Sequence, residues 1–170
     1  MLAPLFKKYF KPDKKFKYVS EINLIDLKNE GIKGIILDLD DTLVPSDKKV
    51  AKQFINDWLF KAKEDFSLFV VSNNRKPNYV KLFCDEIGIP FIARALKPRG
   101  KFLEKAINQM KLDKNAVVIV GDRITTDILA ANLLGIKSIL VSPLTETPSL
   151  LQRTIYKLES IILQISDPKM

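Results

Sequence analysis

The chain has 170 residues, 46% of them hydrophobic and 28% charged, and its 28 basic side chains against 20 acidic ones give a net charge of +8. This length and composition predict one soluble globular domain with a substantial core. No apolar run is long enough for a transmembrane helix or a signal peptide, and a single cysteine excludes an internal disulfide and is typical of the reducing cytoplasm. The sequence has no histidine, which excludes His-dependent catalytic triads and leaves acid–base chemistry to carboxylates.

The first 20 residues form a basic, aromatic arm, which precedes a domain expected over residues 21–170. Residues 1–17 hold six lysines against one acid, Asp13, and interleave them with aromatic and leucine side chains. Lysines beside aromatic rings suit the interface of an anionic membrane. The alternative is an arm whose rings pack onto the domain while its lysines stay in water. The basic charge favours acidic partners: nucleic acid, anionic lipid or a phosphorylated substrate.

Hydrophobic periodicity predicts strands that alternate with helices through the rest of the chain. Short apolar runs predict buried strands at residues 33–38, 68–71, 90–93, 116–120 and 137–141. Apolar residues at helical spacing predict helices at residues 21–29, 48–64, 77–88, 99–111 and 126–134. This alternation is typical of an α/β fold with a doubly wound, mainly parallel sheet.

The same spacing predicts which helical side chains face the core. In the first helix these are Ile22, Ile25 and Leu27, and in the helix at 77–88 Cys84 is expected to be a buried core residue. In the helix at 48–64 they are Val50, Ala51, Phe54, Ile55, Trp58, Leu59 and Ala62. A last amphipathic helix begins at residues 147–148. Its apolar stripe is expected to cover the sheet, with a membrane or dimer contact as the alternative. The stripe consists of Leu150, Leu151, Ile155, Leu158, Ile161, Ile162 and Ile165.

Residues 34–45 are the stretch in which a buried strand ends in a cluster of acids. The apolar residues 35–37 are followed by Asp38, Asp40 and Asp41. Open α/β sheets bind their ligands at the carboxyl ends of the strands. Three carboxylates so close together repel one another unless a cation lies between them, and hard cations such as Mg²⁺ take oxygen ligands. The stretch therefore predicts a metal and phosphate site, with an acidic, solvated turn as the alternative.

Polar residues also follow the next strands of the predicted sheet. Ser72 ends the second strand, Lys97 comes soon after the third, and Asp122 and Asp127 follow the fourth. Phosphoryl transfer uses groups of these kinds. One carboxylate can attack phosphorus and a second can carry the leaving-group proton, while a lysine, a hydroxyl and a metal stabilise and orient the transferred group.

The order and spacing of these residues resemble the four motifs of the haloacid dehalogenase (HAD) superfamily phosphatases, over about residues 33–141. The resemblance implies a Rossmann-like core. It implies that Asp38 is the nucleophile that forms an aspartyl-phosphate, and that Asp40 protonates the leaving oxygen and later deprotonates the attacking water. It implies that the phosphoryl group is bound by Thr42, Ser72, Asn73 and Lys97. It implies a Mg²⁺ cofactor held by Asp38, the backbone carbonyl of Asp40, Asp122 and Asp127.

The intervals between the motifs leave no room for a cap domain. Residues 39–71 are nearly used up by one helix, and residues 73–96 by one helix and one short strand. The resemblance therefore implies a capless enzyme with an open site. Such a site suits a large substrate, a substrate presented by a surface, or closure by oligomerisation.

The finer resemblance is to the YqeG-type phosphatases of HAD subfamily IIIA, through residues 31–34, 72–74 and 95–98. Eukaryotic relatives of this group dephosphorylate phosphatidylglycerophosphate to phosphatidylglycerol, so the resemblance implies a lipid headgroup as substrate. Two residues depart from the Asn and Gln that are common in the group. Asp41 adds negative charge near the metal, and Arg123 adds a cation beside Asp122.

Three functional classes follow. The first is a Mg²⁺-dependent lipid-phosphate phosphatase, expected in the cytoplasm and peripheral at the inner face of a membrane. The second is a HAD phosphatase of soluble sugar or nucleotide phosphates. The third is a nucleic-acid-binding module with a vestigial site, and the intact motifs count against it.

Overall fold

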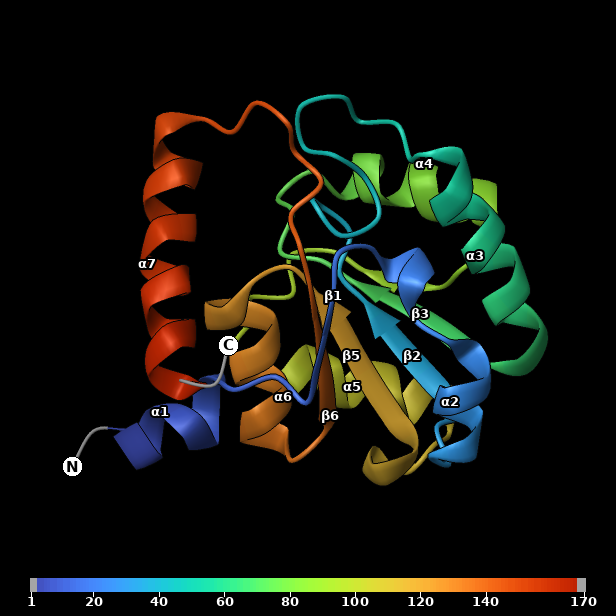
Figure 1. Cartoon of the computed structure of the whole chain (residues 1–170). Coiled ribbons are helices and arrows are strands. Elements are labelled where there is room, and N and C mark those ends of the chain that lie inside the picture. Colours follow the sequence, from blue (N-terminus) through green and yellow to red (C-terminus); the bar gives the residue numbers. More distant parts are fainter. Residues whose placement is uncertain (1–2, 168–170) are drawn as a thin grey trace.

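A parallel sheet runs through the centre of the molecule, and the computed structural model describes residues 3–167 (Figure 1). The strand order is β1-β6-β5-β2-β3-β4, and every pairing is parallel. This confirms the predicted α/β fold with a parallel sheet. The strands are β1 (Lys14–Phe16), β2 (Gly34–Leu37), β3 (Ser67–Val71), β4 (Phe91–Ile92), β5 (Val117–Gly121) and β6 (Lys137–Val141).

Helices lie on both faces of this sheet and follow the alternation that the sequence predicts. Among the described residues the α-helices are α1 (Ala3–Phe10), α2 (Leu24–Asn29), α3 (Gln53–Asp65), α4 (Pro77–Ile87), α5 (Lys101–Met110), α6 (Leu129–Leu134) and α7 (Leu150–Ser166). Shorter turns form the 3-10 helices η1 (Val19–Glu21) and η2 (Lys114–Ala116) and the π-helix η3 (Ile124–Ile128).

The central strand β2 sends alternate side chains to two cores. Ile35 and Leu37 belong to the larger core, which includes residues of α2, α3 and α4, and Ile36 belongs to a second core with residues of α5 and α6. Burial on both faces explains why this strand reads as a continuous apolar run. Cys84 of α4 is fully buried in the larger core, as predicted.

Two helix predictions are wrong in detail. The helix expected over 48–64 begins only at Gln53, and Val50 and Phe54 are exposed. The preceding loop is held by side-chain contacts in place of a helix, because the Asp47 carboxylate accepts hydrogen bonds from the backbone and hydroxyl of Thr147. Ile25 of α2 is also exposed, whereas the other two residues predicted to face inward from this segment are buried.

The N-terminal segment contributes a helix and a strand to the fold. Helix α1 packs beside α6 and α7, and Phe10 packs with Ile162 and Leu163 against a small apolar cluster. Asp13 pairs with Ser138 directly before β1 begins. Its N–H donates to the carbonyl of Ser138 (3.0 Å), and its carboxylate accepts from the Ser138 N–H (2.8 Å). The sequence did not predict β1, which is too short to show a periodic pattern. The first two residues of the arm and residues 168–170 lie outside the described residues.

Most of the predicted apolar stripe of helix α7 faces solvent, although Ile162 packs against the domain. The side facing the domain also carries Gln152, Tyr156 and Glu159. A capping box between Ser149 and Gln152 starts the helix. The prediction that the stripe covers the sheet is therefore wrong, because polar contacts with the loops after the strands orient α7. The exposed members of the stripe are Leu150, Leu151, Leu158, Ile161 and Ile165.

Candidate active site

An open pocket of about 280 Å³ lies at the carboxyl end of the sheet, where β2, β3 and β5 end. Asp38 follows β2 directly, and its N–H donates to the carbonyl of Val120 (2.9 Å), which extends the ladder between β2 and β5 by one residue. This pairing fixes the Asp38 backbone beside the end of β5. The predicted site residues that line the pocket are Asp38, Asp40, Ser72, Asn73, Lys97 and Asp122.

Lys97 joins two of the predicted carboxylates. Its Nζ donates to Oδ1 of Asp38 and to Oδ1 of Asp127, each at 2.6 Å, and all three side chains are buried. Asn73 holds the lysine backbone on both sides: its Oδ1 accepts from the Lys97 N–H (2.7 Å) and its Nδ2 donates to the Lys97 carbonyl (3.1 Å). Asn73 therefore positions the lysine that contacts Asp38.

Burial and mutual repulsion shift the pKa values of these groups. Burial raises the pKa of Asp38 to about 7, an effect that Asp127 increases and Lys97 opposes. Burial, followed by the charges of Asp38 and Asp127, raises the pKa of Asp122 well above its usual range. Burial opposes the charge on Lys97, but Asp127 and Asp38 outweigh it and raise the pKa of the lysine. Lys97 thus pairs with two of the acids, Asp38 and Asp127, while the charge of Arg123 only partly offsets the raised pKa of Asp122.

The three buried acids fit a divalent metal ion. One carboxylate oxygen from each of Asp38, Asp122 and Asp127 lies within 4.8 Å of the others. Oxygen-only ligands and an excess of negative charge are what hard cations such as Mg²⁺ require. Thr42, predicted to bind phosphate, is buried and donates its hydroxyl to Oδ1 of Asp122 (3.2 Å), so it orients a ligand of this set.

Asp40 is half-buried at the pocket wall, and its carboxylate is held from the next strand. Nδ2 of Asn74 donates to Oδ2 of Asp40 (2.8 Å), and the Asn74 N–H donates to Oγ of Ser72 (3.0 Å). The end of β3 therefore positions Asp40. The sequence analysis assigned no role to Asn74, although its place next to Asn73 after a buried strand was a usable signal.

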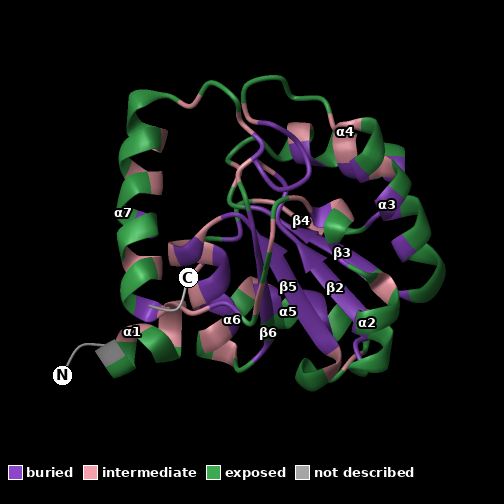
Figure 2. Ribbon diagram, viewed as in Figure 1, coloured by how far each residue is buried: buried purple, intermediate pink, exposed green. Residues whose placement is uncertain are grey.

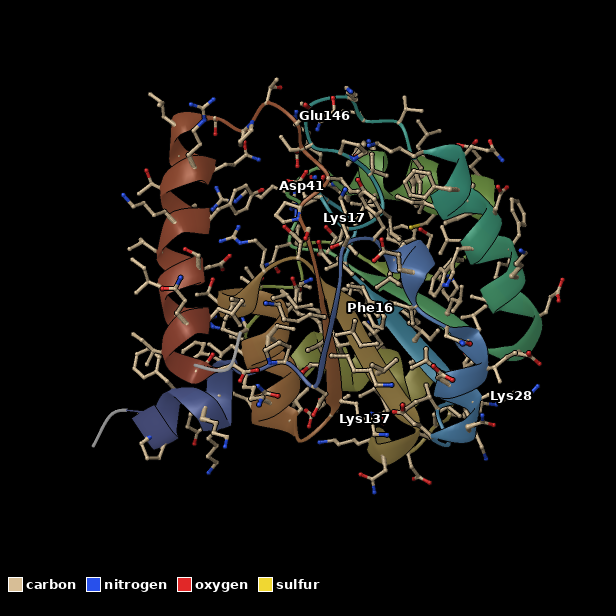
Figure 3. All side chains as sticks on the ribbon, viewed as in Figure 1. Phe16, Lys17, Lys28, Asp41, Lys137 and Glu146 are labelled. Carbon is tan, nitrogen blue, oxygen red and sulfur yellow. The ribbon has the colours of Figure 1, made fainter. Side chains whose placement is uncertain are left out.

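Asp41 connects the loop after β2 to helix α7 (Figure 3). It has a left-handed backbone with φ of 63°, and its carboxylate accepts hydrogen bonds from the Ser46 hydroxyl (2.6 Å) and the Tyr156 hydroxyl (3.1 Å). Nε2 of Gln152 lies 3.5 Å from the same carboxylate, and the Thr145 hydroxyl also donates to it. These contacts turn the polar side of α7 toward the pocket.

Arg123 makes a second connection to α7. Its Nε donates to Oε2 of Glu159 (2.9 Å), whose other oxygen accepts from the backbone and hydroxyl of Thr125. Arg123, Gln152 and Tyr156 line the pocket together with the predicted residues. Nothing in the sequence marked Gln152 or Tyr156, because they lie on the side of an amphipathic helix that was expected to face water.

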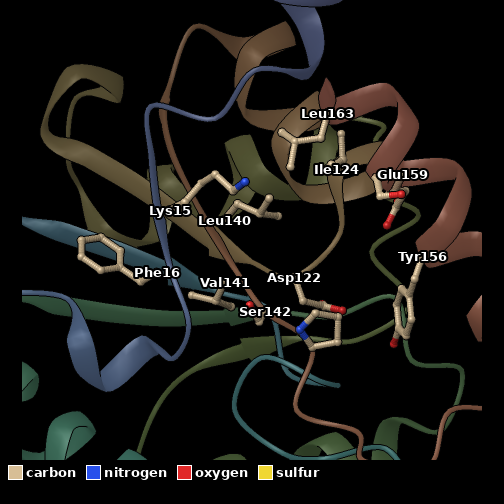
Figure 4. Close-up of a pocket in the computed structure, with 12 residues that line it drawn as sticks. Lys15, Phe16, Asp122, Ile124, Leu140, Val141, Ser142, Tyr156, Glu159 and Leu163 are labelled. Atoms are coloured by element: carbon tan, nitrogen blue, oxygen red, sulfur yellow. The ribbon is translucent and has the colours of Figure 1, made fainter. Parts of the chain in front are cut away.

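A smaller cavity of about 190 Å³ adjoins the pocket and shares Asp122 and Tyr156 with it (Figure 4). It lies between α7 and the strands β1 and β6. Its apolar lining residues are Phe16, Ile124, Leu140, Val141, Pro143 and Leu163, and its charged ones are Lys15, Asp122 and Glu159. This cavity, called the apolar groove below, lies next to the acidic pocket.

The π-helix η3 contains Asp127 and positions it at the site. Oδ2 of Asp127 accepts a hydrogen bond from the Arg123 N–H (3.1 Å), and the Asp127 carboxylate lies against Gly121, the last residue of β5. A Cβ at position 121 would overlap the Asp127 carboxylate. Wider helical turns of this kind are frequent at functional sites.

Replacement of Gly121 by alanine is expected to displace Asp127 and to weaken the binding of a divalent metal by about tenfold or more, the scale of losses at metal-supporting positions. Calorimetric titration with Mg²⁺, together with thermal unfolding, measures this effect. The matched control is Gly100→Ala, whose Cβ would meet only the side chain of Leu134. Unchanged Mg²⁺ affinity in a folded Gly121→Ala protein would contradict the role of this close contact.

Comparison with known proteins identifies the family. A family model described as HAD-hydrolase-like matches residues 95–167. The chain is 39% identical over 160 residues to the "Probable phosphatase YqeG" of Bacillus subtilis (strain 168), which covers 94% of this chain and 92% of that protein. It is also 32% identical over 120 residues to "Phosphatidylglycerophosphatase GEP4, mitochondrial" of Saccharomyces cerevisiae. This alignment covers 63% of this chain and 65% of that protein.

Solved structures share the fold. An uncharacterised protein from Listeria monocytogenes serotype 4b matches with a TM-score of 0.55 and 19% identity, over 79% of this chain and 98% of that one. A predicted HAD-like family hydrolase from Porphyromonas gingivalis matches with a TM-score of 0.51 and 13% identity. The match covers 75% of this chain and 97% of that one. At these identities the likeness concerns the fold alone.

The pocket and these matches together define an enzyme that hydrolyses phosphate esters, and the chain belongs to the HAD superfamily of phosphatases. Within that superfamily it is a YqeG-type phosphatase, because the match to YqeG extends over nearly its whole length. This confirms the resemblance found in the motifs. HAD phosphatases generally use a divalent metal, and the buried carboxylates of Asp38, Asp122 and Asp127 fit one.

Proposed function

We propose that the protein is a Mg²⁺-dependent phosphatase that works through an aspartyl-phosphate and converts phosphatidylglycerophosphate to phosphatidylglycerol. The observation that carries the chemistry is the buried contact of Lys97 Nζ with Asp38 Oδ1, at 2.6 Å, at the wall of an open pocket. The lysine keeps a carboxylate oxygen beside the position of the incoming phosphoryl group and offsets the charge of that group.

The proposed reaction has two halves. An oxygen of Asp38 attacks phosphorus, the bond from phosphorus to the ester oxygen breaks, and Asp40 gives its proton to that oxygen. Water then attacks phosphorus and passes a proton to Asp40, and the bond from phosphorus to Asp38 breaks to release phosphate. Bound Mg²⁺, held by Asp38, Asp122, Asp127 and the Asp40 carbonyl, would stabilise negative charge on the transferred group. Ser72 and Lys97 would hold the phosphoryl oxygens.

Three observations support a lipid substrate. The relative named phosphatidylglycerophosphatase aligns with much of the chain. Between Asp38 and Lys97 the chain forms only α3, β3, α4, β4 and their loops, so no cap closes the pocket. An apolar groove adjoins the pocket, where it could take an apolar part of the lipid that follows the headgroup. No described helix is long and apolar enough to cross a membrane. With a lipid headgroup as substrate, we propose that the enzyme works in the cytoplasm, peripheral at the inner face of a membrane.

A soluble phosphomonoester is the second candidate, because the pocket volume of about 280 Å³ suits a phosphoryl group with a small leaving group. The test is an assay of the purified protein with Mg²⁺ on phosphatidylglycerophosphate in detergent micelles, beside sugar phosphates and nucleotides. We expect the highest kcat/KM for the lipid. A higher kcat/KM for a sugar phosphate or nucleotide would assign the second substrate class. No hydrolysis of any phosphomonoester would contradict the chemistry and favour a binding module for nucleic acid.

Replacement of Asp40 by asparagine is expected to slow turnover of an alkyl phosphate by about 10²- to 10⁴-fold, because an alkoxide leaving group needs the proton. Turnover of p-nitrophenyl phosphate should fall much less, since nitrophenolate leaves without protonation. Steady-state kcat on both substrates measures the difference. Asp113→Asn, which changes an exposed acid before β5, is the matched control. Equal losses on the two substrates would count against Asp40 as the general acid.

A further inference from the structure

The outer face of α7 exposes an unusual row of large apolar side chains. Figure 2 shows the outward side of this helix exposed along most of its length. Residues 151, 158 and 165 recur at intervals of seven and lie on one side of the helix, with residues 150 and 161 beside them. The exposed fractions are 82% for Leu150, 70% for Leu151, 57% for Leu158, 46% for Ile161 and 42% for Ile165.

Packing within the chain does not use this row. The opposite side of α7 makes the contacts with the domain, through the hydrogen bonds of Gln152 and Tyr156 to Asp41 and of Glu159 to Arg123. Near the end of the helix, Ile162 and Leu163 pack with Phe10 against a small apolar cluster. These contacts fix the helix and leave the row of residues 150, 151, 158, 161 and 165 exposed. A contiguous exposed apolar surface of this kind marks a contact with a membrane or a partner.

The charges around the row are positive. The exposed ionic side chains of α7 are Arg153 and Lys157, because its one acid, Glu159, is buried against Arg123. Helix α1 packs beside α7 and adds exposed Leu5, Lys7 and Lys8 without any acid.

The acids nearest to α7 in sequence are already paired with cations. Asp167, just after the helix, forms an ion pair with Lys11, and Glu146, just before it, forms ion pairs with Lys48 and Lys52. Exposed cations therefore lie along one side of the apolar row and at its end near α1, and we call them the cationic border. Such a border is complementary to anionic lipid headgroups.

We propose that this docking face, made of the outer side of α7 with Leu5, Lys7 and Lys8 of α1, binds the surface of an anionic lipid bilayer with α7 lying in the plane of the interface. A second copy of the chain is a poorer occupant, because the exposed charges of both copies would be cationic and would repel each other. This inference rests on the proposed function, because a lipid substrate is presented by a membrane. Its test is a binding measurement that does not depend on catalysis.

The position of α7 connects this docking face to the active site. Exposed Leu150 and Leu151 directly precede Gln152, which lines the catalytic pocket, and Tyr156 lines both that pocket and the apolar groove. A helix with its side chains is about 10–12 Å thick. A headgroup leaving the bilayer would therefore travel about the thickness of one helix to reach the pocket.

The test is flotation of the full-length protein with vesicles of phosphatidylcholine alone and of equal parts phosphatidylcholine and phosphatidylglycerol. The wild-type protein should float with the anionic vesicles, and less so at high salt. The Leu158→Gln/Ile161→Gln variant should lose at least about tenfold in partition, because its apolar contacts are removed. Its matched control, Leu82→Gln, changes a 73% exposed leucine on α4 and should bind as the wild type does.

A second pair of variants tests the cationic border. Arg153→Gln/Lys157→Gln should lower partition by roughly 25-fold, since each cation near an anionic surface contributes about fivefold. The variant Lys101→Gln/Lys105→Gln on α5 carries the same change in net charge. It should bind the anionic vesicles more tightly than the Arg153→Gln/Lys157→Gln variant does. Hydrolysis of p-nitrophenyl phosphate should be unchanged in all four variants, which shows that the fold and the pocket are intact.

Several results would overturn the docking face. These are no flotation of the wild-type protein, an equal loss in the α7 variants and their controls, or a dimer in sedimentation that dissociates on Leu158→Gln/Ile161→Gln without any vesicle binding. Vesicle binding without hydrolysis of phosphatidylglycerophosphate in micelles would reject the proposed substrate and keep the docking face. Hydrolysis in micelles without vesicle binding would reject the docking face and keep the substrate.

Discussion

Replacement of Asp38 by asparagine is expected to lower kcat by about 10⁴-fold or more, the scale seen when a catalytic nucleophile is removed. The amide is uncharged and a poor nucleophile, so no aspartyl-phosphate can form. The change also removes a carboxylate from the group of three that fits the metal. Release of inorganic phosphate from p-nitrophenyl phosphate measures the loss, and trapping of the phosphorylated protein reports the intermediate directly.

The stability of the same variant separates a chemical defect from a folding defect. Burial raises the pKa of Asp38 to about 7 in the metal-free protein, so the folded state binds the proton more tightly than the unfolded state. Stability is therefore lost as pH rises from the unfolded pKa through about 7. Asparagine removes this loss, so above neutral pH the metal-free variant should unfold at the same temperature as the wild type or higher. A stable variant with wild-type turnover would show that Asp38 is not the nucleophile.

The sequence predicted the site residues that come directly after the ends of strands. The run of residues 35–37 marks a strand buried on both faces, and Asp38 follows it. Because parallel strands end at the same edge of a sheet, Ser72 and Asp122 come to the same pocket without any knowledge of the loops. The existence of the pocket was therefore predictable from local pattern and topology.

The contacts that orient α7 were not predictable in this way. Asp41 accepts a hydrogen bond from Tyr156, which lies more than a hundred residues further along the chain. Glu159 accepts one from Arg123, which lies on a separate loop. Periodicity identifies the apolar side of a helix but not whether that side faces the core or an external partner. Polar contacts decided the orientation of α7, and with it the exposure of Leu158 and Ile161.

Removal of the divalent metal is expected to stop turnover, with a loss of about a thousandfold or more, because a metal contributes several kcal/mol of charge stabilisation. Without it, three buried carboxylates lie close together, and Lys97 pairs with only two of them, Asp38 and Asp127. Turnover in excess chelator, followed by addition of Mg²⁺ or Ca²⁺, measures the requirement. Mg²⁺ should restore activity. Ca²⁺ should restore little, because it prefers more ligands at longer distances.

The affinity for Mg²⁺ is expected to rise from about pH 6 to about pH 8, since metal and protons compete for the same oxygens. Burial raises the pKa of Asp38 to about 7 and that of Asp122 well above its usual range, so protons bind these acids more tightly than usual and compete with a cation for their oxygens. Calorimetric titration in two buffers of different ionisation enthalpy measures the released protons. The Asp127→Asn variant should bind Mg²⁺ more weakly, and Asp113→Asn, which changes an exposed acid outside the pocket, should not. Full turnover in chelator, or an affinity independent of pH, would contradict a metal held by these carboxylates.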